Sequence, residues 1–334
     1  MKLPRLILRT TRATARVGTK VGVYSATVLG KAVAGRIVTL PAVEDVPQGR
    51  MVDLPASAGY SGGRTFVVDV PGPTPDAPTA VLLHGLGCTA YLCWFGSIAE
   101  LARTHRVVTF DQRWHGRGIH SDRFRFVDCA DDAAAVMDAL GIDRALVVGY
   151  SMGGAVAQEL WHRHPERVSG LVLASTARNF RGHAREKLFF SLMTLTMNPL
   201  SRVAQPKVER FALGLPDVSP YDARDRVGWG AREFRSTSAW SMPEVLGELG
   251  RFNSAPWIGG VDVPTAVVVT TRDKAIPARR QRALAAAIPA AEVLEAPGGH
   301  ASVVMDHAGW FPVFLEAVAD VTTRTPTQRR SAAG

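Results

Sequence analysis

The amino-acid sequence predicts an α/β fold, with a mostly parallel central sheet flanked by helices and an inserted helical segment. From about residue 64, short apolar runs alternate with longer helical patterns. Alternation of this kind is typical of a parallel sheet covered by helices on both faces. The alternation stops over residues 178–259 and then resumes. An interruption inside a continuing sheet pattern indicates an insertion and not a second domain.

The strands of this sheet are predicted as short runs, most of them apolar, with Thr79–Leu83 buried. They are Thr79–Leu83, Arg106–Phe110, Ala145–Gly149, Gly170–Ala174, Thr265–Thr270 and Glu292–Glu295. Helical patterns follow them: one that includes Ser97–Arg103, then Asp131–Leu140, Gly153–His164, Pro277–Ile288 and Ala308–Val321. We therefore divide the chain into a basic N-terminal segment (1–45), a core (46–177 and 260–320), a helical cap insertion (178–259) and a basic tail (321–334).

The composition is that of an ordinary globular protein. Of the 334 residues, 46% are hydrophobic and 21% charged, so a sizeable core is available. The length fits one α/β domain with an inserted subdomain. The three cysteines, at positions 88, 93 and 129, match neither a disulfide framework nor a zinc-binding spacing. We expect no metal, no cofactor and a cytoplasmic location.

The net charge of +9 is concentrated at the two ends of the chain. Residues 1–40 contain eight basic and no acidic residues, and residues 321–334 contain three basic residues and no acid. The body between them is close to neutral. A nucleic-acid binder needs a basic face on its folded domain, so we expect no nucleic-acid partner.

The N-terminal segment has the pattern of a basic helix. Its charges recur at steps of four, three, four and four positions, at Arg5, Arg9, Arg12, Arg16 and Lys20. On a helix they form one stripe, which could contact an anionic membrane surface. Four glycines favour a solvated arm instead, and both interpretations stay open. Export is a minority alternative, based on Ala-Val-Ala at 32–34, whereas the longest apolar stretch is too short to span a membrane.

A strand–turn–helix motif supplies the candidate nucleophile. The predicted strand 145–149 runs into Gly149-Tyr150-Ser151-Met152-Gly153, which is G-x-S-x-G in the context that this motif requires. Gly149 and Gly153 lack β-carbons, so neighbouring backbone can approach and the serine hydroxyl is exposed above the sheet. The amide of Met152, at a helix N-terminus, is a candidate oxyanion donor.

His300 is the best candidate for the base that such a serine needs. It lies in a glycine loop directly after a predicted strand, at the carboxyl edge of the sheet where α/β folds bind substrates. His162 and His164 fall at a helix end, where a capping role is expected. His307 lies at a helix start, and His105, His120 and His183 have no motif around them.

Asp273 is the candidate acid that orients His300. It follows the strand 265–270, and the chain order of serine, aspartate and histidine fits the motif. Asn179, in the loop after the preceding strand, and Asp306, a candidate helix cap, are the alternatives.

The loop His84-Gly85-Leu86-Gly87 follows an earlier strand and is the candidate source of the second oxyanion donor. We assign that donor to the Leu86 amide. His84 and Gly85 are interpreted as the residues that turn the chain, so His84 is a structural residue and not a rival base.

Together these motifs resemble the α/β-hydrolase superfamily over about residues 60–320. The matching segments, in order, are 84–87, Trp94, Asp111–Gly118, Gly149–Gly154, Asp273 and Gly298–His300. The resemblance implies the fold, a Ser-Asp-His triad and a helical cap over the active site at residues 178–259.

Three positions depart from the family pattern. Relatives often have glycine at Trp114 and serine at Gly118, so we expect an altered loop in which Trp114 reaches towards the mouth of the active site. Relatives also often have a glutamate five residues after the histidine, where this chain has Met305 followed by Asp306.

The predicted cap favours an apolar substrate. The stretch Leu188–Leu200 is apolar nearly all round, so a helix there must be covered on more than one side. It either lines an acyl pocket or is buried within the cap. Aromatic residues add bulk nearby, at Phe234, Trp240, Phe252 and Trp257. An apolar pocket favours an ester or lipid with an apolar acyl chain.

The sequence therefore predicts a lipase-like serine esterase that cleaves a carboxylic ester through an acyl-enzyme on Ser151. The same residues would serve acyl transfer to an alcohol, and the family also includes cofactor-free perhydrolases. A non-catalytic scaffold tethered by the basic arm is the third class of function. A complete set of three catalytic residue types weighs against it.

Overall fold

The structure is a computed structural model that describes residues 40, 43–57, 59–181, 214–216, 221–238 and 241–326. The predictions for the N-terminal helix, for the apolar stretch Leu188–Leu200 and for the end of the basic tail lie outside these described residues. The fold below is that of the described part of the unit that begins at Leu40.

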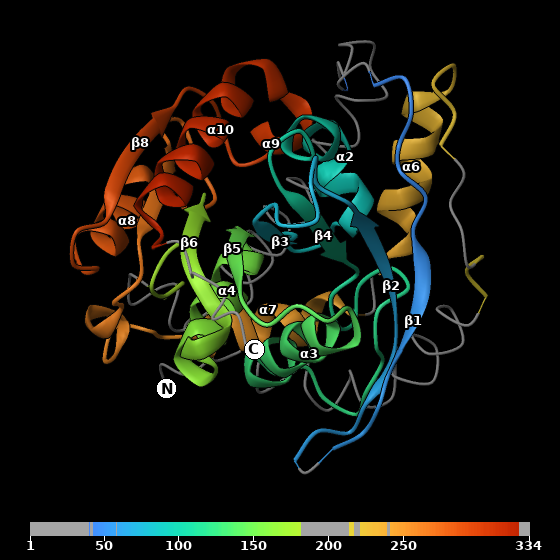
Figure 1. The fold of residues 1–334 in the computed structure, drawn as a ribbon, viewed down its shortest axis with the longest axis horizontal. Helices are drawn as coiled ribbons and strands as arrows, with labels where there is room; N and C mark the ends of the chain where they lie inside the picture. The colour runs from blue at the N-terminus through green and yellow to red at the C-terminus, as the bar shows by residue number, and fades with distance from the viewer. Residues whose placement is uncertain are drawn as a thin grey trace, which may run out of the picture. The chain divides into compact units, whose positions relative to one another are not determined.

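Eight strands form one sheet in the order β1-β2-β4-β3-β5-β6-β7-β8 (Figure 1). The strands are β1 (Arg50–Leu54), β2 (Gly63–Val70), β3 (Thr79–Leu83), β4 (Arg106–Phe110), β5 (Ala145–Tyr150), β6 (Val168–Ala174), β7 (Thr265–Thr270) and β8 (Glu292–Ala296). β1 and β2 are antiparallel to their neighbours and all other pairs are parallel. The predicted mostly parallel sheet is confirmed, and the two antiparallel strands at its edge were not predicted.

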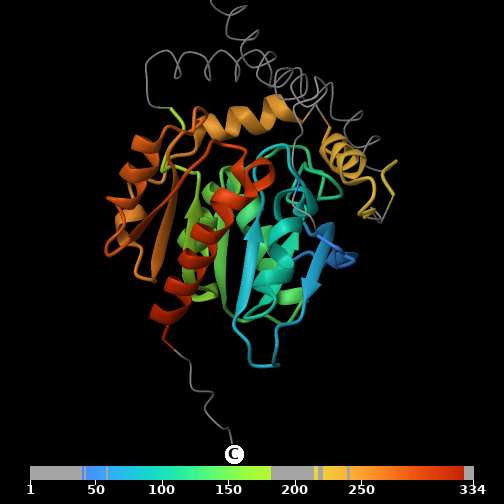
Figure 2. The same cartoon turned by 90° about the horizontal axis from the view of Figure 1, so that it is seen from above.

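Helices cover both faces of this sheet. They are α2 (Ala90–Leu101), α3 (Phe126–Ala139), α4 (Met152–Arg163), α6 (Arg226–Ser236), α7 (Met242–Arg251), α8 (Ala278–Ala285), α9 (Ser302–Met305) and α10 (His307–Arg324). α2 and α10 pack on one face and α3 and α4 on the other (Figure 2). This arrangement buries β3, β4, β5, β6 and β7 on both sides, which explains their continuous apolar runs.

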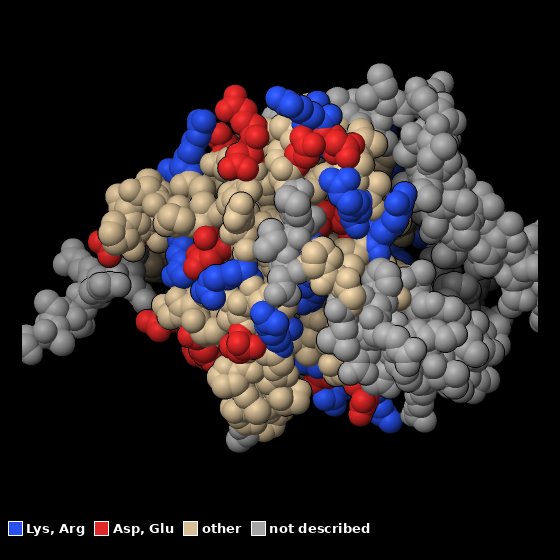
Figure 3. All heavy atoms as spheres, turned by 90° about the vertical axis from the view of Figure 1, so that its right-hand side faces the viewer, with Lys and Arg blue, Asp and Glu red and all other residues tan. Residues whose placement is uncertain are grey.

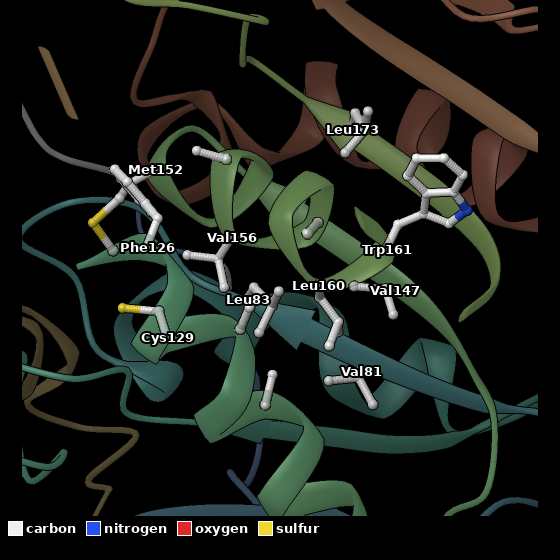
Figure 4. Packing of buried hydrophobic residues seen from close by; sticks show 14 of the residues in the cluster. Val81, Leu83, Phe126, Cys129, Val147, Met152, Val156, Leu160, Trp161 and Leu173 are labelled. Carbon is white, nitrogen blue, oxygen red and sulfur yellow. The ribbon is translucent and has the colours of Figure 1, made fainter. Parts of the chain in front are cut away.

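The packing beneath α4 anchors the helix that follows the candidate nucleophile. Val156 and Leu160 of α4 lie among Leu83 of β3 and Val147 of β5, and none of these four side chains is accessible to solvent (Figure 4). Fully burying an aliphatic side chain contributes on the order of 1.5–3 kcal/mol. This packing therefore fixes the position of α4 on β3 and β5.

The insertion leaves the sheet after β6 and returns to it at β7. These two strands are direct neighbours, with Leu171 opposite Thr265, so the insertion does not interrupt the sheet. Its described part contains the helices α6 and α7, which lie beyond one end of the strands (Figure 2). The helical character of this part agrees with the prediction, whereas its role as a cap over the site stays a prediction.

Charged side chains of both signs are interspersed among the described residues on the face shown in Figure 3. Within the described ranges, the structure has no helix that is both long and apolar enough to cross a membrane.

A buried ion pair ties the loop after β4 to α3. Arg113 binds Asp132 through two hydrogen bonds of 2.9 and 2.7 Å, and both side chains are at most 3% exposed. The hydroxyl of Tyr60 also donates to Asp132, at 2.9 Å. Burial raises the pKa of Asp132 although Arg113 lowers it. The carboxylate therefore depends on these partners to stay charged in the folded protein.

Replacing Arg113 with methionine should lower the free energy of unfolding by about 3–5 kcal/mol at pH 7, because a buried carboxylate loses its partner. An acid whose pKa is raised by folding stabilises the folded state below that pKa and loses this contribution as the pH rises. The difference in the free energy of unfolding between wild type and variant should therefore become smaller from pH 7 to pH 5, as measured by urea unfolding. Arg125→Met, at the exposed pair with Asp128, is the control and should cost less than about 1 kcal/mol. Equal losses in the two variants would contradict this account.

Candidate active site

Ser151 lies at the tight turn between β5 and α4. Its backbone has φ 54° and ψ −114°, a region that residues with a side chain rarely adopt. Such a conformation costs on the order of 1–3 kcal/mol and persists only where the surroundings enforce it. Here its amide donates to the carbonyl of Ala174, and its own carbonyl accepts from the hydroxyl of Thr176 at 2.8 Å.

The two glycines of the motif allow the close backbone approach that this turn requires. A β-carbon on Gly153 would lie 2.1 Å from the carbonyl oxygen of Leu83, and one on Gly149 would lie 2.4 Å from that of Gly153. No side chain fits at either position. The predicted structural role of Gly149 and Gly153 is thus explained by contacts with backbone.

His300 meets Ser151 from the loop after β8. Its Nε2 lies 2.8 Å from the Ser151 hydroxyl, and its Nδ1 lies 2.7 Å from Oδ2 of Asp273. A carboxylate only accepts hydrogen bonds, so Nδ1 carries the proton and Nε2 is the acceptor for the serine hydroxyl. The structure therefore brings the three predicted residues together in the predicted order.

Asp273 is enclosed by donors, and its side chain has no solvent exposure. One carboxylate oxygen accepts the amides of Ala275 and Ile276, both at 2.8 Å. The other accepts the Thr270 hydroxyl at 3.0 Å in addition to His300. Satisfying a buried carboxylate in this way offsets the cost of its desolvation.

Two residues that support the site were not predicted. Gln281 of α8 donates to Asp273 at 3.2 Å and to the carbonyl of Ile276 at 2.7 Å. The hydroxyl of Tyr150 donates to the carbonyl of His300 at 2.6 Å. Gln281 shares a helix face with the buried Leu284 and Ala285. For Gln281, the available signal in the sequence was a lone polar residue on an apolar helix face.

The candidate oxyanion donors flank the serine. Met152 is the first residue of α4. The loop containing Leu86 lies next to Ser151: a β-carbon on Gly85 would be 3.4 Å from the Ser151 β-carbon. Neither the Leu86 nor the Met152 amide donates a backbone hydrogen bond within the described part of the chain. Met152 and Leu86 thus belong to the turn and the loop that meet at Ser151, and the role of their amides as oxyanion donors stays a prediction.

His84 is buried and holds this loop. Its Nε2 accepts the amide of Gln112 at 2.9 Å, and its Nδ1 donates to the carbonyl of Gly85 at 2.9 Å. Burial and the neighbouring His115 lower the pKa of His84 well below its usual range. A neutral imidazole with both nitrogens bonded cannot serve Ser151 as a base, in agreement with the structural interpretation.

Neither alternative to Asp273 as the orienting residue bonds to the His300 ring, whose partners in the described part of the chain are Ser151 and Asp273. Asn179 pairs with Asn253 in an isolated β-bridge. Asp306 stands at the N-terminus of α10, but its side chain makes no capping hydrogen bond, so that predicted cap was wrong. Within the described ranges, no group of three or more His, Cys, Asp or Glu residues is arranged to hold a metal ion.

The expectation that Trp114 reaches towards the site was wrong. Trp114 is 2% exposed, and its indole nitrogen donates to the carbonyl of Ser121 at 3.1 Å. Its backbone has φ 65°, the left-handed region that favours glycine. At Gly118 a β-carbon would lie 2.4 Å from the carbonyl oxygen of Gln112, so serine would not fit there without a shift.

Two aromatic residues that were expected near the substrate pack elsewhere. Phe252 is buried against Phe126 and Phe180 in the hydrophobic core. Trp257 stacks on His162, at the end of α4 far from Ser151. Core packing therefore accounts for both residues without a substrate.

A mostly parallel eight-stranded sheet, with a serine on a strained strand–turn–helix and histidine and aspartate on later strand-end loops, defines the α/β-hydrolase class. A family model described as the alpha/beta hydrolase fold matches residues 78–306. The chain belongs to the α/β-hydrolase family.

Relatives and solved structures agree with this membership. A putative carbamate hydrolase RutD of Klebsiella pneumoniae (strain 342) is 28% identical over 258 residues, covering 75% of this chain and 94% of the relative. The enol-lactonase of Burkholderia xenovorans LB400 has a TM-score of 0.62 at 24% identity, covering 80% of this chain and 99% of its own. A thermophilic esterase of Thermogutta terrifontis has a TM-score of 0.61 at 20% identity, with 81% and 99% covered.

Gly153→Ala should lower the free energy of unfolding by at least about 2 kcal/mol, because the added β-carbon meets the Leu83 carbonyl, which cannot move without disturbing β3. The matched control is Gly260→Ala, where the nearest atom is 3.7 Å away and the change should be within about 0.5 kcal/mol. Urea unfolding measures both. Similar values for the two variants would show that the close approach at the turn does not constrain the fold.

Proposed function

We propose that this protein is a serine hydrolase that cleaves a carboxylic ester through an acyl-enzyme on Ser151. The observation that carries the proposal is the unbroken series of short contacts from Asp273 through His300 to Ser151, at 2.7 and 2.8 Å. The site combines a nucleophile, a base and a group that orients the base.

The reaction follows from these contacts. His300 Nε2 takes the hydroxyl proton as Ser151 Oγ attacks the carbonyl carbon, and the amides of Leu86 and Met152 stabilise the oxyanion. The tetrahedral intermediate collapses as His300 returns the proton to the departing alcohol, which leaves an acyl-enzyme. Water then attacks the acyl carbon with His300 again as base, releasing the acid and restoring Ser151. Asp273 holds the imidazole tautomer and stabilises its positive charge in both halves.

The comparisons support a carbonyl substrate with a heteroatom leaving group. Relatives are named as putative carbamate hydrolases, and structural neighbours are described as an enol-lactonase and as esterases. Esters, lactones and carbamates all react through an acyl carbon and an oxyanion. We place a carboxylic ester first, and an apolar acyl chain or lipid ester is favoured by the apolar stretch Leu188–Leu200 within the insertion.

The second candidate is acyl transfer, since an alcohol could replace water in the second half of the reaction. The same three residues would serve it, and a cofactor-free perhydrolase would use them with peroxide. Product analysis in the presence of a short alcohol separates hydrolysis from transfer: free acid supports the hydrolase, and a new ester as the main product supports the transferase.

Ser151→Ala should abolish hydrolysis of short p-nitrophenyl esters while the far-ultraviolet circular dichroism stays unchanged. In a related serine hydrolase, loss of the triad left a residual acceleration of only roughly 10³–10⁴ over water. The wild type should turn over esters faster than matched carbamates and lactones. Retention of more than about a tenth of the wild-type kcat would overturn the assignment of the nucleophile.

Asp273→Asn should keep the fold and lower kcat by up to about 10⁴, because an amide cannot stabilise the imidazolium and favours the wrong tautomer. The comparator variants are Asp306→Asn and Asn179→Ala, because among the described residues the His300 ring is hydrogen-bonded to Ser151 and Asp273 and to neither of these side chains. Steady-state kinetics on the same ester measures all three. A near-normal Asp273→Asn beside an inactive comparator would mean that another residue orients the base.

We also propose that the basic N-terminal segment contacts anionic membrane. Deleting residues 1–40 should leave turnover of a soluble ester nearly unchanged, because the site residues begin at His84. Binding to vesicles that contain phosphatidylserine should weaken, since basic residues contribute on the order of 1 kcal/mol each near such a surface, and salt should weaken it further. Sedimentation at low and high salt measures this binding. Equal, salt-independent partitioning of the two forms would contradict the proposal.

A further inference from the structure

The helix α6 of the insertion docks on α2 through one aromatic side chain. Trp229 is fully buried, with its ring 5.1 Å from that of Phe95 and 6.2 Å from that of Tyr91, both on α2. The helix α2 begins at Ala90, directly after the loop that contains Leu86. The insertion is therefore packed against the element that follows the candidate oxyanion loop.

Glu233, one turn further along α6, enters the core with its carboxylate. Its side chain is 1% exposed. One oxygen accepts from Arg117 at 2.9 Å, and the other accepts the hydroxyl of Thr89 at 2.5 Å. A buried carboxylate is retained only where its partners offset its desolvation, so this contact fixes α6 to two core loops at once.

Thr89 links this contact to the first turn of α2. Its hydroxyl donates its single proton to Glu233 and accepts the amide of Leu92 at 3.0 Å, as an N-cap does. With the proton committed to Glu233, the lone pair of Thr89 points at the Leu92 amide. The rotamer of the cap is thus set by a residue of the insertion.

Asp111 holds the same turn from the other side. One of its oxygens accepts the amide of Ala90 at 2.8 Å and the other that of Arg117 at 2.9 Å. Burial and the charge of Glu233 raise the pKa of Asp111 to about 6, and Arg117 opposes them. The amide of Ala90 is therefore bound by Asp111 and that of Leu92 by Thr89, and Glu233 and Arg117 complete this network.

We propose that Glu233, a residue of the insertion, is a positioning residue that holds the loop 84–89, and with it the Leu86 amide, in place. The loop is clamped at one end by His84, bonded to Gln112, and at the other end by Thr89, bonded to Glu233. An oxyanion donor acts only when it is held at the correct distance and angle. This inference rests on the proposed function, since it assigns a task to the predicted oxyanion loop.

The charges of the network make the test practicable. Glu233→Gln removes one of two negative charges and leaves Asp111 and Arg117 as a balanced pair, so the core is not left with an uncompensated charge. Thr89→Val removes the hydroxyl with little change of volume, and Thr89→Ser keeps it. Glu100→Gln is the control, because Glu100 lies at the other end of α2, 42% exposed, in a pair with Arg103.

The experiment measures kcat and KM on a short p-nitrophenyl ester, inhibition by a phenylboronic acid that forms a tetrahedral adduct, and the melting temperature. Glu233→Gln and Thr89→Val should each lower kcat by about ten- to a hundredfold, with KM changed by less than about threefold. The inhibition constant of the boronic acid should rise in parallel with the loss of kcat/KM. Thr89→Ser should restore most of the activity that Thr89→Val loses. The double variant should lose no more activity than the less active of the two single variants.

Two results would overturn the inference. Folded Glu233→Gln and Thr89→Val proteins with kcat within about twofold of Glu100→Gln would show that the insertion does not position the loop. A drop in melting temperature without a change in boronic acid affinity would assign Glu233 to stability alone. If Glu233→Gln fails to fold, the comparison of Thr89→Val with Thr89→Ser decides. These outcomes are distinct from failure of the proposed function, which would appear as a wild type without esterase activity or an active Ser151→Ala.

Discussion

The close approach of the turn at Ser151 to the end of β3 is the constraint on which the site depends. Gly153 lies against the Leu83 carbonyl with no room for a side chain. The helix α4, packed on β3 and β5, holds that contact, and the strained backbone of Ser151 follows from it. Because Leu83 is also the last residue of β3, the same contact brings the loop after β3 next to the serine. One packing interaction thereby brings together the turn that carries the nucleophile and the loop that carries Leu86.

The charged groups of the site are held by a second layer that is almost entirely buried. Asp273 receives donors from its own loop and from α8, and His300 is fixed through both its ring and its backbone carbonyl. The loop after β3 is fixed by His84 at one end and by the network around Glu233 at the other. Each of these groups would be costly to bury alone, so each constrains its partners. The geometry around Ser151 is therefore a property of the loops after β3, β4, β5, β6, β7 and β8 and the insertion together.

Local patterns predicted the parts of this structure that local physics determines. The strands β3, β4 and β7 begin and end at the predicted residues, because they are buried on both faces and read as continuous apolar runs. The edge strand β1 is half exposed, so its pattern is weak. Gln281 and Tyr150 were missed because their partners come from other elements. Trp114 was misjudged because a bulky residue in a left-handed conformation opposes local preference, and core packing around its ring decides the outcome.

The most direct test of the central claim, that Ser151 is an activated nucleophile, is covalent labelling with a fluorophosphonate followed by intact mass and peptide mapping. The folded protein should gain the mass of one phosphonyl group, located on Ser151. Ser151→Ala and the urea-unfolded protein should gain none, because the reaction needs His300 at 2.8 Å from the hydroxyl. An unlabelled folded protein, or a label on another residue with Ser151 unmodified, would contradict the account.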